Sequence, residues 1–295
     1  MEKNPKNKKN NKKDSQKKPF YKTLRFWQIM VLLILLAVLT AGLYVGLRDS
    51  LRIPGRKESR PQAETDPALT APPPPENPYG ALDFHYEGDY LACSSGESHL
   101  GIDVSYWQGD IDWQQVKDAG VEFVIIRVAY RGSGIGKLEA DTMAQANYEG
   151  ARAAGLKVGA YVFSQAITPE EAVEEADFAL DLTKDWEMDM PLVYDWEYID
   201  EESRTAGLDP RTLTDCTAAF CRTVVEAGRE SMIYFNADQS HKQMYLSELV
   251  GYGFWLAMYG QTMDYPYKID MWQYTNSGTV PGINGNVDLN LQLIY

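Results

Sequence analysis

The feature that most constrains the fold of this chain is a regular alternation of apolar segments and helical segments from residue 100 onward. Three of the helical segments end in the same dipeptide, Ala-Gly, at positions 119–120, 154–155 and 227–228. Glycine readily adopts the left-handed conformation that ends a helix. Each pair comes shortly before an apolar, β-branched run typical of a buried strand. Strands and helices that alternate in units of about 30–40 residues indicate a parallel sheet covered by helices.

The number of predicted strands favours a closed barrel. Strands are expected at residues 101–104, 122–130, 157–163, 192–197, 231–235, 254–258, 270–274 and 287–291. Helices are expected at residues 112–119, 139–154, 168–184 and 212–227, which leaves little helix in the last third. We therefore predict an α/β fold, an irregular TIM-like β/α barrel, with an open doubly wound sheet as the alternative. The first strand is not followed by a glycine-rich phosphate loop, which argues against a nucleotide-binding form of that alternative.

The beginning of the chain has the composition of a membrane anchor rather than of an enzyme domain. Residues 1–28 are rich in lysine and predict a disordered, basic cytoplasmic tail. Residues 29–47 contain no charged side chain and are long enough to span a membrane as an uncleaved signal-anchor helix. A cleaved secretory signal, with residues 40–42 as a weak cleavage site, is the alternative. Ten basic residues precede the span and five follow it, which favours a cytoplasmic N-terminus and places the rest of the chain on the outer side of the cell membrane.

A spacer and a short extension separate this segment from the predicted barrel. Residues 48–78 are interpreted as a linker, because they end in four consecutive prolines at 72–75 that favour an extended, semi-rigid chain. Residues 79–99 are poorly patterned and are expected to form an N-terminal extension, a flap or a hairpin. Residues 61–295 contain 38 acidic and 13 basic side chains, a net charge of −25 that argues against nucleic acid as a partner. The three cysteines (Cys93, Cys216 and Cys221) show no metal-ligand spacing, and neither a metal nor another cofactor is expected.

Two acidic residues follow the strongest candidate for a core strand. Residues 190–198 read MPLVYDWEY, so that Asp195 and Glu197 lie one residue apart where the apolar run ends. Alternate residues of a strand point to the same face, with Cα atoms about 6.6 Å apart. Carboxyl groups held together raise each other's pKa, which produces the proton donor that cleavage of a glycosidic bond requires. A pair of solvated acids at a strand end is the structural alternative.

Further acidic and aromatic residues lie at the ends of the other predicted strands. In a parallel barrel the catalytic groups gather at the C-terminal ends of the strands. The candidate acids there are Asp103, Asp195, Glu197 and Asp288, and the candidate substrate-binding residues are Tyr161, Tyr234, Trp255, Tyr259, Trp272 and Gln273. Aromatic rings stack on the apolar faces of sugars, while phenol and amide groups provide oriented hydrogen bonds. The acids of the third predicted helix, among them Glu171 and Glu175, are expected to form a solvated face.

Several segments, in order along the chain, resemble the family 25 glycoside hydrolases, the muramidase-type lysozymes of bacteria and phages. Residues 101–109 (GIDVSYWQG) are similar to the N-terminal signature of that family, and residues 158–165 (VGAYVFSQ) to its third strand. Residues 195–197 (DWE) resemble its catalytic D-x-E motif, and residues 272–290 its closing segment. The resemblance covers residues 100–295. It implies a distorted β/α barrel that hydrolyses the β-1,4 bond between N-acetylmuramic acid and N-acetylglucosamine in peptidoglycan strands.

The resemblance also implies roles for the acids. Glu197 corresponds to the general acid/base and Asp195 to the partner carboxylate, which stabilises an oxocarbenium-like centre or a cyclised acetamido group. Asp103 and Asp288 correspond to two further acids of the site. The spacing of the acids leaves retaining and inverting mechanisms open, and analogy with other D-x-E enzymes acting on N-acetyl sugars favours retention. The alternatives are a catalytically silent wall-binding or scaffold protein, which the presence of all four acids disfavours, and an enzyme that cleaves a chitin-like or alternate glycan linkage. The sequence does not indicate an oligomeric state.

Overall fold

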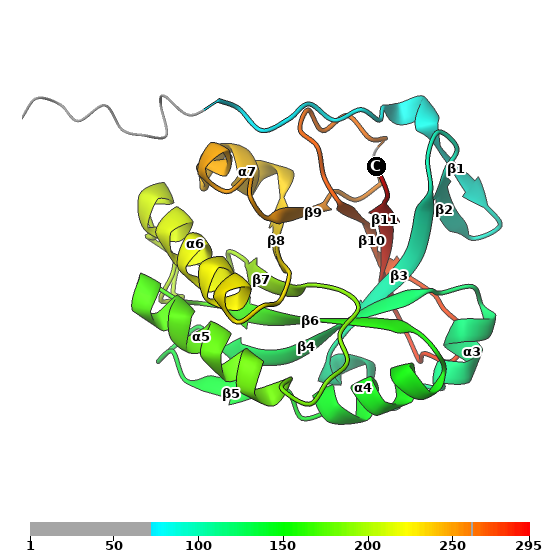
Figure 1. Ribbon diagram of the computed structural model, residues 1–295, viewed down its shortest axis with the longest axis horizontal. Helices are drawn as coiled ribbons and strands as arrows, with labels where there is room; N and C mark the ends of the chain where they lie inside the picture. Colours follow the sequence, from blue (N-terminus) through cyan, green and yellow to red (C-terminus); the bar gives the residue numbers. More distant parts are fainter. Residues whose placement is uncertain (1–71, 261) are drawn as a thin grey trace, which may run out of the picture. The chain divides into compact units, whose positions relative to one another are not determined.

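Eight strands close into a ring in the computed structural model, which describes residues 72–260 and 262–295 (Figure 1). The strands of the ring are β3 (Ser98–Val104), β4 (Phe123–Arg131), β6 (Lys157–Ser164), β7 (Leu192–Trp196), β8 (Ser231–Asn236), β9 (Gly253–Ala257), β10 (Met271–Gly278) and β11 (Val287–Leu293). Each strand pairs with the next, and β11 pairs back with β3. A short strand, β5 (Leu138–Ala140), pairs with β4 alone. The ring confirms the predicted barrel over the open sheet.

Strand β11 departs from the predicted parallel arrangement, because it runs antiparallel to both β10 and β3. An antiparallel neighbour needs only a short connection, and residues 279–286 join β10 to β11 without a helix. The reversal brings the beginning of β11 to the rim at which the parallel strands end. Asp288, the second residue of β11, therefore lies directly opposite Asp103, the second-to-last residue of β3.

Helices cover the outside of the ring between successive strands: α3 (Trp113–Asp118), α4 (Ala144–Ala153), α5 (Pro169–Leu182), α6 (Pro210–Glu226) and α7 (Ala237–Lys242). The predicted glycine caps are confirmed, since Gly120, Gly155 and Gly228 all have positive φ angles. Helix α4 begins later than the predicted residue 139, because residues 138–140 pair with β4 as β5. The side chain of Asp141 then accepts a hydrogen bond from the amide of Met143 and turns the chain toward the helix.

Helix α5 does not present only a solvated acidic face to water. Glu175 is fully buried and its Oε1 atom lies 2.6 Å from Nε of Arg131, a buried residue of β4. Burial raises the pKa of Glu175 to about 7, although the adjacent guanidinium opposes this shift. Glu171 pairs with Arg204 at 2.7 Å. The expectation of a solvated face was therefore wrong for these two acids, because helical spacing alone did not reveal the cations that they meet.

The barrel interior is filled by side chains that alternate with those of the outer layer. Along β4, Phe123 and Ile125 point into the barrel, whereas the intervening residues pack against the helices. A Cβ atom on Gly101 would lie 2.1 Å from the ring of Phe123, and one on Gly159 would lie 2.7 Å from Cδ1 of Ile125. The two glycines therefore leave the space that these large side chains occupy. This packed layer closes the barrel below the rim at which the parallel strands end, and we call it the barrel floor.

The N-terminal extension is a hairpin that covers the ring where helices are scarce. Strands β1 (Phe84–Glu87) and β2 (Tyr90–Cys93) pair with each other, and the ring of Phe84 meets that of Trp272 in β10 at a centroid distance of 5.1 Å. Pro75 and Asn77 make backbone hydrogen bonds with the segment before β10. The last residues of the predicted linker thus contact the segment before β10.

The predicted basic tail and membrane span, residues 1–47, lie outside the described residues. Within residues 72–260 and 262–295, none of the helices has the length and apolar character needed to cross a membrane.

Candidate active site

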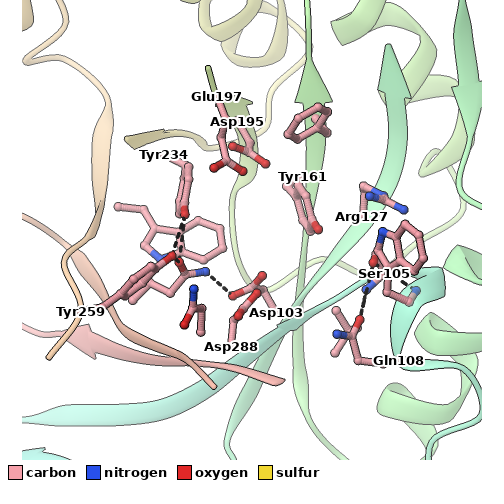
Figure 2. A pocket seen from close by; sticks show the side chains of 16 residues that line it. Asp103, Ser105, Gln108, Arg127, Tyr161, Asp195, Glu197, Tyr234, Tyr259 and Asp288 are labelled. Carbon is pink, nitrogen blue, oxygen red and sulfur yellow. Dashed lines mark hydrogen bonds between the residues drawn. The ribbon is translucent and has the colours of Figure 1, made fainter. Parts of the chain in front are cut away.

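A cavity of about 400 Å³ opens at the rim where β3, β4 and β6 to β9 end and β11 begins (Figure 2). All four predicted acids line it, together with Tyr161, Tyr234, Trp255, Tyr259 and Gln273. Asp195 and Glu197 lie side by side in Figure 2, and Asp103 and Asp288 form a second pair. Nine of the ten predicted site residues are thus brought together around one cavity.

Trp272 is the predicted residue that the structure places elsewhere. Neighbouring residues of a strand point to opposite faces, so that only one of Trp272 and Gln273 can face the cavity. Gln273 points inward, while the indole of Trp272 packs on Phe84 outside the ring and donates to the carbonyl of Met258 at 2.9 Å. The expected sugar contact of Trp272 is therefore corrected: this side chain anchors the N-terminal hairpin.

Strand alternation presents Asp195 and Glu197 to the cavity. Val193 of the same strand belongs to the interior layer, and Tyr194 and Trp196 pack on the outer side. Asp195 is only 5% exposed, and its Oδ1 atom is buried without a hydrogen-bond partner among the described residues. Such an oxygen costs free energy unless a ligand donates to it. Asp195 is therefore poised to accept a hydrogen bond from a bound molecule.

Burial and like charge raise the pKa of both acids. Burial raises the pKa of Asp195 well above its ordinary value, and the nearby charge of Glu197 adds to the effect. Burial also raises the pKa of Glu197, followed by the charge of Asp103. Glu197 is the more exposed of the two. It thus combines access to a ligand with a raised pKa, the properties of a general acid.

Asp103 and Asp288 form a carboxyl pair across the β3–β11 ladder. Asp288 shares a side-chain hydrogen bond with Asp103. Burial raises the pKa of Asp288 to about 8, and the charge of Asp103 and their hydrogen bond contribute. Oδ2 of Asp103 also accepts hydrogen bonds from Nε2 of Gln273 and Nδ2 of Asn290, both at 2.8 Å. One proton is therefore held between the two carboxyls at neutral pH, on Asp288.

The aromatic residues orient the amides that bind Asp103. Tyr234 donates to Oε1 of Gln273 at 2.9 Å, and Tyr259 donates to the same oxygen. Nε1 of Trp255 donates to Oδ1 of Asn290 at 2.9 Å. With their oxygens occupied in this way, both amides turn their N–H groups toward the carboxylate. The three aromatic residues, which were predicted to bind substrate, thus also hold the carboxylate of Asp103 in place through these amides.

Arg127 is a site residue that the sequence analysis missed. Its Nη2 atom lies 2.8 Å from Oδ2 of Asp141, and its guanidinium stacks 4.8 Å from the ring centroid of Tyr106. The signal that could have found it is its position in β4, since it continues the inward series of Phe123 and Ile125. Its charge lowers the pKa of Asp195 and opposes the effect of burial.

The loop that follows β3 supplies one wall of the cavity. Ser105, Trp107 and Gln108 line it, and the side chain of Ser105 caps the short 3₁₀ helix Tyr106–Gln108. Trp107 is 72% exposed, which leaves its ring accessible at the mouth of the cavity. These residues lie within the segment GIDVSYWQG but were not among the predicted site residues.

The side chains that line the cavity indicate acid–base chemistry. The described residues contain no cluster of three or more His, Cys, Asp or Glu side chains arranged to hold a metal ion. The cavity instead combines a proton donor, a buried carboxyl that lacks a partner, and aromatic and amide groups. This combination suits the cleavage of a glycosidic bond.

Comparisons with known proteins agree with this chemistry. A family model described as glycosyl hydrolases family 25 matches residues 102–283. Lysozyme M1 of Streptomyces globisporus is 30% identical over 200 residues, which cover 64% of this chain and 66% of that protein. A structure of the modular autolysin LytC from Streptococcus pneumoniae in complex with a synthetic peptidoglycan ligand has a TM-score of 0.59 at 26% identity, and covers 66% of this chain and 46% of that one.

A bacterial lysozyme from Streptomyces coelicolor has a TM-score of 0.52 at 29% identity, over 66% of this chain and 91% of that one. The match to Lysozyme M1 thus spans slightly less than two thirds of that relative, and the match to the autolysin spans about half of it.

Proposed function

The chain belongs to glycosyl hydrolase family 25, and on this basis we propose that it is a peptidoglycan hydrolase, a lysozyme that cleaves the β-1,4 bond between N-acetylmuramic acid and N-acetylglucosamine. The observation that carries the proposal is the presence of Asp195 and Glu197 side by side in the rim cavity, one without a partner and the other able to donate a proton. The relatives named lysozymes, and the autolysin bound to a peptidoglycan ligand, support the choice of substrate.

Glu197 is the general acid/base in this proposal. Its carboxyl group is partly exposed in the cavity, where a leaving oxygen can reach it. Burial raises its pKa, so that it retains a proton to give to that oxygen. After the bond breaks, its carboxylate can accept a proton from the incoming water.

In its ionised form, which the charge of Arg127 favours, Asp195 stabilises positive charge. Its unpartnered oxygen favours retention with substrate assistance. The N–H of the acetamido group at C2 of the sugar is a donor suited to that oxygen. With its N–H held there, the acetamido oxygen attacks the anomeric carbon while the glycosidic bond breaks and the Glu197 proton moves to the leaving oxygen. Water then attacks the same carbon and gives a proton to Glu197, while the bond from that carbon to the acetamido oxygen breaks and the acetamido group is regenerated. Two displacements at one carbon retain its configuration.

Asp103 and Asp288 act on the electrostatics of the site in this proposal rather than as proton donors to the glycan. Their shared proton limits the pair to a single negative charge. That charge raises the pKa of Glu197 and favours the positive transition state.

The function is tested with Glu197→Gln and Asp195→Asn in the full-length chain, assayed by mass spectrometry of muropeptide digests. General acid catalysis contributes about 10²–10⁴-fold, so Glu197→Gln should lose at least that much turnover while still binding glycan. On a glycoside whose leaving group needs no protonation, Glu197→Gln should regain most of its first-step rate, and Asp195→Asn should not.

Glu201→Gln, an exposed acid four residues beyond Glu197, is the matched control and should retain activity. Rescue of Asp195→Asn but not of Glu197→Gln would reverse the two roles. A wild-type chain that binds glycan without cleaving it would instead favour the wall-binding alternative on the same barrel. The position of the new reducing end separates muramidase cleavage from cleavage of the alternate linkage.

We also propose that residues 29–47 anchor the enzyme in the cell membrane, with its barrel on the cell-wall side. The support is the uncharged run and the ten basic residues before it. Protease added to protoplasts should then remove the barrel and leave the basic tail protected. A mature protein found free in the medium and beginning near residue 42 would show that the segment is a signal peptide.

A further inference from the structure

Glu197 lies just beyond the part of β7 that the sheet holds in place. The ladder between β6 and β7 ends at the pair Ser164 and Trp196, and the ladder between β7 and β8 ends at Asp195 and Tyr234. Strand β7 itself ends at Trp196. The backbone of the general acid is therefore without the ladder hydrogen bonds that fix its neighbour Asp195.

The side chain of Gln165 supplies the missing support. Its Nε2 atom donates to the carbonyl oxygen of Glu197 at 2.9 Å and to the carbonyl oxygen of Ser164 at the same distance. Gln165 directly follows β6 and is fully buried. Its amide thus bridges the ends of two adjacent strands, in the place where the next ladder hydrogen bond would form.

Gln165 is held in turn by the loop that follows Glu197. Its Oε1 atom accepts a hydrogen bond of 2.7 Å from the hydroxyl of Thr205, which is also buried. Its backbone carbonyl accepts from Nη1 of Arg204 at 3.2 Å, and Nη2 of Arg204 donates to Glu171 at 2.7 Å. Because its oxygen is engaged by Thr205, the amide of Gln165 has its N–H groups directed at the carbonyls of Ser164 and Glu197.

We propose that Gln165 is a positioning residue: its amide holds Glu197 in the position from which this general acid protonates the leaving oxygen. Thr205 fixes the orientation of Gln165. This inference rests on the proposed function, in which Glu197 protonates that oxygen. A displacement of about 1 Å in a reacting group can cost about 10²-fold in rate. The carbonyl of Trp196 has a separate support, because it accepts from Nε2 of Gln239 at 2.9 Å. Loss of the Gln165 amide should therefore release Glu197 while β7 stays in place.

The experiment compares Gln165→Met and Thr205→Val in the full-length chain. Methionine has a similar length but cannot donate to the carbonyl of Glu197, and valine keeps the shape of threonine without its hydroxyl. Thr217→Val is the matched control, because this buried threonine of α6 donates to Leu213 within its own helix at 2.8 Å. Thermal unfolding establishes that each variant is folded.

On soluble glycan fragments of peptidoglycan, Gln165→Met should lose about 10- to 100-fold in kcat with little change in KM. The loss should be much smaller on a glycoside whose leaving group needs no proton. The pKa of a more hydrated Glu197 should fall, so the alkaline limb of the kcat profile should move to lower pH. The charged groups that face Glu197 (Asp103, Asp195, Asp288 and Arg127) are unchanged in this variant. Thr205→Val should show the same changes at smaller size, and Thr217→Val none.

The inference is overturned if folded Gln165→Met keeps the kcat and the pH profile of the wild type. An equal loss on both substrates with an unshifted profile would also overturn it, because a general disturbance of the site would then explain the effect. If Gln165→Met does not fold, the test rests on Thr205→Val. The inference is then overturned if Thr205→Val has the same ratio of activities on the two substrates as the wild type. A wild-type chain that cleaves no glycan would refute the proposed function together with this role, whereas an active wild type with an unaffected Gln165→Met refutes this role alone.

Discussion

The shared proton of the carboxyl pair predicts that Asp288→Asn stabilises the protein as the pH rises. The pKa of Asp288 is raised from 3.8 to about 8, chiefly by burial and then by the charge of Asp103. Between these two values the folded chain holds a proton that the unfolded chain has released. The free energy of unfolding therefore decreases with increasing pH in this window, by up to about 1.4 kcal/mol per pH unit. Asparagine takes up no proton and can still donate a hydrogen bond to Asp103.

The difference between variant and wild type follows from that slope. Near pH 4 the two proteins should be similarly stable, because Asp288 is protonated in the folded wild type and asparagine replaces its hydrogen bond. By pH 7 the free energy of unfolding of Asp288→Asn should exceed that of the wild type by about 4 kcal/mol. Above pH 8 the difference should stop growing, because Asp288 is then ionised in both states of the wild type.

The measurement is urea unfolding of the full-length chain at intervals from pH 4 to pH 9. Asp185→Asn is the matched control, because the side chain of Asp185 is exposed after α5. Its stability difference from the wild type should stay near zero throughout. A difference for Asp288→Asn that is the same at pH 5 and pH 8 would refute the raised pKa and with it the shared proton.

Arg131→Met should lower the free energy of unfolding by about 3–5 kcal/mol at pH 8, because it leaves the buried Glu175 without its cation. The loss should shrink as the pH falls toward about 7, the raised pKa of Glu175, because the buried carboxyl then takes up a proton. A pH-independent loss measured by urea unfolding would contradict the assignment. Gly101→Ala should cost about 1–3 kcal/mol, because its Cβ atom would overlap the ring of Phe123 in the barrel floor. Gly251→Ala, at a site with open space, is the control; equal melting temperatures for the two variants would show that the floor can adjust.

Local patterns were sufficient to predict the eight strands of the ring and the glycine-capped ends of three helices. The Ala-Gly pairs marked helix ends because the positive φ of Gly120 and its counterparts is a local property of the backbone. The common face of Asp195 and Glu197 was predictable for a similar reason, since the two-residue repeat of a strand does not depend on its partners.

Other parts of the site depended on partners that the sequence does not specify. The repeat of a strand separates its two faces but does not say which of them is inside, which is why Trp272 was expected in the cavity and Arg127 was missed. The direction of β11 was predicted wrongly, because a short strand carries no local signal of its orientation. The pairing of Asp103 with Asp288 follows from that direction alone.

The sequence by itself thus determined the strands of the ring, most of its helices and the adjacency of Asp195 and Glu197, all of which arise from interactions between near neighbours in the chain. Only the tertiary structure decided which carboxyls share a proton, which lack a partner and which cations they meet. Burial and long-range hydrogen bonds control these properties, and they exist only after the ring has closed. The support of Glu197 by Gln165, 32 positions earlier in the chain, belongs to this second group.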